Sequence, residues 1–145
     1  MNSMEQKKFV ACLADANDFF SIAHCVKRPE LEFLTPYIVN LGFCCELYLK
    51  AICMKTNPHA KYTREHCIDA LLDSLPTDVK SQIESAYSNH GIPLSLQDFL
   101  KQCNCPFVQW RYEFEKEKIT INISALDALA CTLNEYCKKL VESEW

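Results

Sequence analysis

The stretch that decides the fold is Pro36-Tyr-Ile-Val-Asn-Leu-Gly-Phe-Cys-Cys-Glu-Leu-Tyr-Leu-Lys-Ala-Ile-Cys-Met54. Thr35 can cap a helix here, and proline suits the first helical position because the N–H it lacks would have no partner there. On a helix, apolar side chains of this stretch point in nearly every direction, while Glu46 and Lys50 share one narrow strip. A helix that is apolar all round is a buried helix. The stretch therefore predicts a central core helix that carries a carboxylate.

A membrane span is the alternative that the length of this stretch allows. However, Asn40, Glu46 and Lys50 fall within one 11-residue window, and ionisable side chains are costly at bilayer depth. The N-terminal segment 1–8 also has no apolar run behind its charges, unlike a signal peptide. We therefore expect a cytoplasmic protein with no membrane partner.

The composition narrows both fold and function. A chain of 145 residues, 49% of them hydrophobic, fits a single globular domain that spans 1–145. Because only 2 glycines occur, the chain contains neither the glycine-rich motif of a dinucleotide-binding loop nor that of a phosphate-binding P-loop. The net charge of −4 argues against broad binding along a phosphate backbone, but it leaves room for a small local basic site.

The 10 cysteines are expected to be free thiols in a reducing compartment. Most lie within apolar helical patterns, where a free cysteine behaves as a small hydrophobic residue. The spacing of Cys103 and Cys105 does not match the paired ligands of a structural zinc site, and we expect neither a metal nor a cofactor. Cys67 beside His66 is the one pair that could make a cysteine nucleophile, but adjacent residues on a helix point apart.

Apolar residues at three- and four-residue steps, together with proline and glycine stops, predict a helical chain. Thr63 is a candidate N-cap for the short third helix, and Gly91 suits the left-handed residue that ends the fourth. The predicted helices cover residues 4–26, 36–54, 66–75, 78–90, 95–103 and 123–143. Alternating residues near 107–121 fit a short strand or hairpin as well as a helical turn. We predict an all-α, up-and-down bundle of about five to six helices.

The most informative polar set comprises Glu46, Lys50, His66, Asp69 and Arg111. Glu46 precedes Lys50 by four residues, the orientation that favours an ion pair on a helix. One interpretation is a structural salt bridge extended by Arg111, which would pin the C-terminal segment to the central helix. The other places Arg111 and His66 in a polar cleft, where the planar guanidinium binds a phosphate or another anionic ligand.

Trp110, Arg111 and Tyr112 allow a related pair of interpretations. Together they could stack on and grip a nucleotide, whereas aromatic residues at alternating positions are more often part of a core. The candidate ligand-binding residues are therefore Glu46, Lys50, His66, Trp110, Arg111 and Tyr112, and the candidates for catalysis are His66 and Arg111.

Three segments resemble those of HEPN (higher eukaryotes and prokaryotes nucleotide-binding) domains, in the same order and spacing. Phe43-Cys-Cys-Glu-Leu-Tyr-Leu-Lys-Ala51 is similar to the family's ALELLLKA segment. His66-Cys-Ile-Asp-Ala-Leu-Leu-Asp-Ser-Leu75 resembles its GHDLxxLxxxL helix, and Phe107-Val-Gln-Trp-Arg-Tyr-Glu-Phe-Glu115 resembles the FxxWRYxYE segment of a bacterial subset. The resemblance implies an all-α, often dimeric bundle that associates with nucleotides or RNA. It also implies a toxin–antitoxin, defence or stress system, with a nucleotidyltransferase or antitoxin as partner.

Catalytic members of the HEPN family share an Arg-x4-6-His motif and cleave RNA without a metal. Here no histidine follows Arg111, and histidine is the usual group for moving protons near neutral pH. The resemblance then implies a non-catalytic, homodimeric module that binds a nucleotide, RNA or a protein partner, rather than an enzyme. One alternative is a metal-independent endoribonuclease that uses Arg111 with His66, and another is a purely structural interaction subunit.

Overall fold

The computed structural model describes residues 1–25, 34–112 and 121–143. Within these ranges the fold is all-α, as predicted, and contains no strand. The helices are α1 (Ser3–His24), α2 (Leu34–Thr56), α3 (Ile68–Asp73), α4 (Thr77–Ser88), α5 (Leu96–Gln102), α6 (Pro106–Arg111) and α7 (Ile123–Glu142). Gly91 follows α4 with φ of 68°, as its position after the helix predicts.

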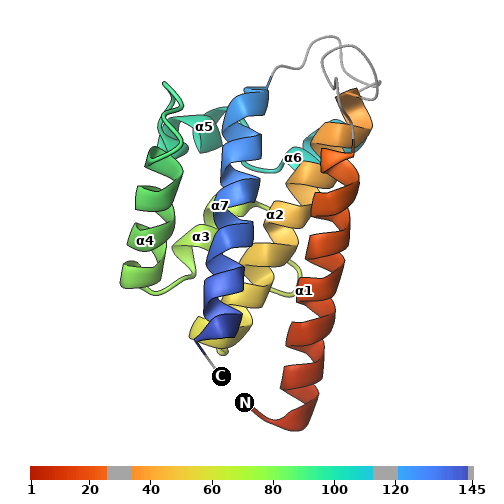
Figure 1. Cartoon of the computed structure of the whole chain (residues 1–145), viewed down its shortest axis with the longest axis vertical. Coiled ribbons are helices and arrows are strands. Elements are labelled where there is room, and N and C mark those ends of the chain that lie inside the picture. Colours follow the sequence, from red (N-terminus) through yellow and green to blue (C-terminus); the bar gives the residue numbers. More distant parts are fainter. Residues whose placement is uncertain (26–33, 113–120, 144–145) are drawn as a thin grey trace.

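The four long helices alternate in direction along the chain. In Figure 1, α1 and α4 rise from the end of the bundle where both chain termini lie, and α2 and α7 run back toward that end. The short helices α3, α5 and α6 lie in the connections between them. The predicted up-and-down arrangement is therefore confirmed.

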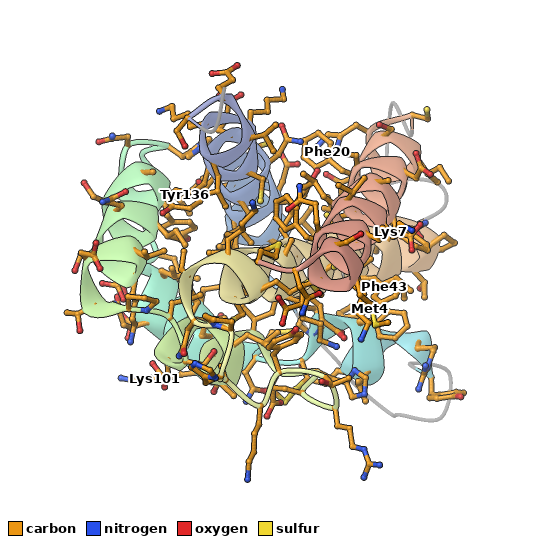
Figure 2. The ribbon with its side chains drawn as sticks, turned by 90° about the horizontal axis from the view of Figure 1, so that it is seen from below. Met4, Lys7, Phe20, Phe43, Lys101 and Tyr136 are labelled. Carbon is orange, nitrogen blue, oxygen red and sulfur yellow. A yellow bond between two sulfur atoms is a disulfide. The ribbon has the colours of Figure 1, made fainter. Side chains whose placement is uncertain are left out.

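Helix α2 is the central element, with 12 buried residues that include Glu46. Helices α1, α6, α3 and α7 all pack against it, and Figure 2, which looks along the bundle, shows them around it. By length and composition α2 is the one described helix that could cross a membrane, and 67% of its most apolar window is buried inside the fold. Neighbouring helices therefore bury α2, as expected for a core helix.

A partly buried polar network joins the three helices α1, α2 and α7. The Tyr48 hydroxyl of α2 donates to Asn17 Oδ1 of α1 at 2.7 Å, and Asn134 Nδ2 of α7 donates to the Tyr48 oxygen at 2.8 Å. Burial raises the pKa of Tyr48, so this hydroxyl stays protonated. Because a buried polar group is stable only with partners, the network fixes how the three helices meet.

Helix α3 is shorter than predicted, and the prediction that Thr63 caps it is wrong. Cys67 occupies the N-cap position without a side-chain hydrogen bond. The Glu65 carboxylate instead accepts from the N–H groups of His66 at 3.0 Å and Cys67 at 2.9 Å. The N–H of Ile68 donates to the backbone oxygen of Asn104 at 2.7 Å. The hydrogen bonds from Glu65 and Asn104 therefore take the place of the predicted Thr63 cap. The spacing of residues in the sequence does not predict the bond to Asn104, because it joins distant segments.

Helix α6 settles part of the ambiguous segment in favour of helix. It begins at Pro106 and lies directly on the backbone of α2 at Gly42. A Cβ atom at Gly42 would lie 2.8 Å from the Phe107 nitrogen and 2.9 Å from Pro106 Cβ. The absence of a side chain at Gly42 therefore lets the two helices touch. The alternative hairpin around 116–118 falls outside the described residues.

We expect Gly42→Ala to lower the free energy of unfolding by about 1–3 kcal/mol, the usual cost of overpacking a core. The added methyl group must push α6 away, so Trp110, which is 6% exposed, should become more hydrated and its fluorescence emission should shift to the red. Gly91→Ala is the matched control, because nothing lies within 4 Å of its Cβ position and only backbone strain follows. Equal emission and equal stability of Gly42→Ala and the wild type would contradict the close contact.

Candidate functional site

Glu46 is the centre of the candidate site and is only 1% exposed. Its Oε1 accepts from Lys50 Nζ at 2.7 Å and from His66 Nδ1 at 2.9 Å. Its Oε2 has no hydrogen-bond partner among the residues that the structure describes. An ionised carboxylate in this position is stable only because bases are supplied to it. The predicted Glu46–Lys50 pair is confirmed, and His66 is the base that comes from elsewhere in the fold.

The two bases differ in their exposure to solvent. The Lys50 side chain, one turn along α2, is 11% exposed, whereas the His66 side chain is 53% exposed. Because the carboxylate can only accept, His66 Nδ1 carries the proton of their hydrogen bond. In the neutral ring Nε2 is then the basic nitrogen, the arrangement that catalytic carboxylate–histidine pairs use.

A disulfide fixes the segment that carries His66, so the expectation of free thiols is wrong for 2 of the 10 cysteines and confirmed for the other 8. Cys67 is bonded to Cys105, which precedes α6. Asp69 also turns toward this junction, where its Oδ2 accepts from Asn104 Nδ2 at 3.1 Å. The disulfide excludes Cys67 as a nucleophile in this state. The sequence could not show the bond because its two cysteines are 38 residues apart.

Arg111 does not extend the Glu46 salt bridge, so that interpretation is also wrong. Among the described residues Glu46 forms ion pairs with Lys50 and His66 only. The Arg111 guanidinium lies over the ring of Phe107, 4.9 Å from its centroid, and over the ring of Tyr112 at 4.8 Å. Charge complementarity alone suggested the pairing with Glu46, whereas the short helix α6 keeps Arg111 beside its own aromatic neighbours.

The contact between Arg111 and Phe107 is extended by further phenylalanines that reach across α2 to α1. Phe107 stacks on Phe43 of α2 with centroids 4.4 Å apart, and Phe43 meets Phe19 of α1 edge-on at 4.6 Å. We call Phe19, Phe43, Phe107, Arg111 and Tyr112 the aromatic stack. Sequence reasoning missed its phenylalanines, although the four-residue step from Phe107 to Arg111 was a signal that the two share a helix face.

The three adjacent residues predicted to grip a nucleotide separate in the structure. Trp110 is 6% exposed and belongs to the core, where its Nε1 has no hydrogen-bond partner among the described residues. Tyr112 is 46% exposed, and Arg111 is also exposed. Only Arg111 and Tyr112 are therefore placed where a ligand could reach them.

The connection between α2 and α3 adds basic side chains to the same side of the protein. Lys61, Arg64 and His66 of this connection are exposed. Figure 2 shows the connection and α6 on the side of α2 that faces away from α7. We call Lys61, Arg64, His66 and Arg111 the basic face. These side chains are basic and exposed on a chain whose net charge is −4.

Comparison with known proteins does not add to this geometry. No family model, curated protein or solved structure matches the chain. The features that bear on function are therefore the basic face, the aromatic stack, and Glu46 with its partners Lys50 and His66.

Proposed function

We propose that this chain is a non-catalytic, HEPN-like helical module whose basic face binds RNA or a free nucleotide. The observation that carries the proposal is the position of the Arg111 guanidinium, which is exposed and lies against aromatic rings. This arginine is exposed, lies over the rings of Phe107 and Tyr112, and forms no ion pair with a carboxylate among the described residues.

Such an arginine is suited to phosphate recognition. Contact with aromatic rings restricts the guanidinium without using its N–H groups, which remain available to form paired hydrogen bonds with phosphate oxygens. The half-exposed ring of Tyr112 offers a surface on which a base can stack. Phosphate contact and base stacking at one place are what a nucleotide or a short single strand of RNA requires.

The rest of the basic face supports binding of a chain rather than a single phosphate. Lys61 and Arg64 are exposed in the α2–α3 connection, where they could contact further phosphates. The resemblance to HEPN domains supports, in addition, a homodimer, a place in a toxin–antitoxin, defence or stress system, and a nucleotidyltransferase or antitoxin as partner.

We expect Arg111→Ala to weaken the binding of a short single-stranded RNA by about 1.5–3 kcal/mol, the range for losing a hydrogen bond to a charged group. The measurement is fluorescence anisotropy of labelled RNA across a salt series. Because Arg111 contacts phosphate in this proposal, the slope of log affinity against log salt should fall by about 1. Arg111→Lys keeps the charge but loses the planar group, so it should restore the slope more than the affinity.

Lys138→Ala is the matched control, because it removes an exposed positive charge from α7, which Figure 2 shows on the other side of α2. It should leave RNA affinity nearly unchanged. Equal losses in Arg111→Ala and Lys138→Ala would mean that binding is only a response to net charge. If neither RNA nor nucleotides bind the wild type, the alternative of a structural interaction subunit is favoured instead.

The second candidate is a metal-independent endoribonuclease, which the geometry of His66 favours. Its Nδ1 is bonded to the buried Glu46, so Nε2 could take the proton of a ribose 2′-hydroxyl. The O2′ would then attack phosphorus, and the 5′-oxygen would leave with a proton from solvent, giving a 2′,3′-cyclic phosphate. The test is RNA cleavage with a chelator present. Cleavage that disappears in His66→Ala and Arg111→Ala but persists in Lys138→Ala would establish the enzyme, whereas intact RNA would favour the binding module.

A further inference from the structure

Three side chains of different chemistry meet where α1 ends and α7 begins, the end of the bundle away from both termini (Figure 1). The residues are His24, Asp127 and Cys131, and their ligand atoms all lie within 4.8 Å of one another. His24 Nε2 lies 2.6 Å from Asp127 Oδ1, and Cys131 Sγ lies 3.9 Å from the same oxygen. None of the three belongs to the proposed RNA-binding face.

The other ring nitrogen of His24 has a partner of its own. Nδ1 lies 2.8 Å from the backbone oxygen of Phe20, and a carbonyl oxygen only accepts, so Nδ1 carries a proton. Nε2 therefore either donates a second proton to the Asp127 carboxylate or, once this 2.6 Å contact opens, directs its lone pair at a cation that both groups bind. Histidines that bind metals commonly donate their other N–H to a backbone carbonyl in this way.

Asp127 has a tyrosine, Tyr37, as a neighbour. Burial, together with the negative charge of Asp127, raises the pKa of Tyr37 to about 12, so its hydroxyl is neutral at neutral pH. The outer hydrogen bond that orients a ligand of this cluster is the one from His24 Nδ1 to the Phe20 oxygen.

We propose that His24, Asp127 and Cys131 bind Zn²⁺. Nitrogen, oxygen and sulfur are the ligand atoms that zinc accepts, and three protein ligands leave a fourth tetrahedral position for water. The sulfur disfavours Mg²⁺ and Ca²⁺, which prefer oxygen ligands. Solvent can reach the fourth position, because the side chains of His24 and Asp127 are 33% and 39% exposed.

All three separations must change when zinc binds. Zinc bonds of about 2.0–2.3 Å at tetrahedral angles separate ligand atoms by about 3.3–3.6 Å. The 2.6 Å contact between His24 and Asp127 must open, and the 3.9 Å contact between Asp127 and Cys131 must close, each by less than about 1 Å. The His24 and Cys131 ligand atoms, which lie within 4.8 Å of each other, must approach by at most roughly 1–1.5 Å. Burial raises the pKa of Cys131 to about 11, so zinc must also displace the thiol proton, as it does at other cysteine sites.

The test is a titration of the chelator-treated full chain with Co²⁺, followed by competition with Zn²⁺. We expect one Co²⁺ per chain with the sulfur-to-cobalt charge-transfer absorption of a thiolate ligand, and Zn²⁺ should remove this absorption. Cys131→Ser should abolish the band. His24→Gln and Asp127→Asn should each weaken Zn²⁺ binding by at least about tenfold, which is the low end of the effect of losing even an outer partner.

One further variant separates a built site from chance binding by thiols. Cys25→Ser removes the exposed thiol next to His24 and should leave the spectrum and the stoichiometry unchanged. Circular dichroism confirms the fold of each variant. A band that survives in Cys131→Ser, or Zn²⁺ affinities of His24→Gln and Asp127→Asn equal to the wild type, would overturn the proposal.

Discussion

Glu46→Ala is expected to lower the free energy of unfolding by about 3–5 kcal/mol, because it removes one partner of a buried ion pair. Lys50, whose side chain is 11% exposed, would then keep its charge with little water to solvate it. His66 would lose its partner at smaller cost, since its side chain is 53% exposed. Chemical denaturation monitored by circular dichroism measures the effect.

A double-mutant cycle shows whether the lost stability comes from the interaction between Glu46 and Lys50. Glu46→Leu combined with Lys50→Met replaces both charges with apolar side chains, and such replacements are often neutral or stabilising. We expect the double variant to be more stable than Glu46→Leu alone, with a coupling energy of at least about 1 kcal/mol. Additive losses would contradict the pairing.

The matched control is Glu84→Ala in the i,i+4 pair of α4. There Lys80 Nζ lies 3.9 Å from Glu84 Oε1, and the two side chains are 35% and 31% exposed. Exposed pairs contribute about 0–1 kcal/mol. A large loss at Glu84 would mean that burial is not what makes the Glu46 pair important.

The fold was largely predictable because its signals are local. The all-round apolar character of α2, the apolar stripe of α7 and the stop at Gly91 depend on neighbouring residues only, and the structure has each of them. Residues 106–112 were ambiguous because the same alternation of Trp110 and Tyr112 occurs in strands. Packing on Gly42, which a sequence pattern does not show, is a feature only of the folded chain.

The site was predictable only where its contacts are local. Glu46 and Lys50 are one helical turn apart, so the sequence gives their distance as well as their charges. His66 is 20 residues from Glu46, and the sequence named it as a candidate without naming its contact. Arg111 was assigned to the wrong neighbours for the same reason. Contacts between distant segments depend on how helices pack, and a single sequence carries no direct signal for them.

The Cys67–Cys105 disulfide is expected to contribute about 4 kcal/mol to stability, from the entropy of closing a loop in the unfolded chain with a sequence separation of 38. Cys67→Ser combined with Cys105→Ser should lower the free energy of unfolding by about that amount. A reductant should have the same effect on the wild type and none on the double variant. Cys25→Ser is the matched control, because this thiol is free and exposed.

Thiol counting tests the bond itself, independently of stability. Alkylation of the unfolded, unreduced protein followed by mass spectrometry should label 8 cysteines, and labelling after reduction should reach all 10. Ten labels without reduction would show that the protein carries thiols at positions 67 and 105. The N–H of Ile68 would still bond the Asn104 oxygen at 2.7 Å in that case. His66 could then remain beside Glu46 without the Cys67–Cys105 bond. RNA binding by the basic face can therefore be tested separately from the stability that the disulfide contributes.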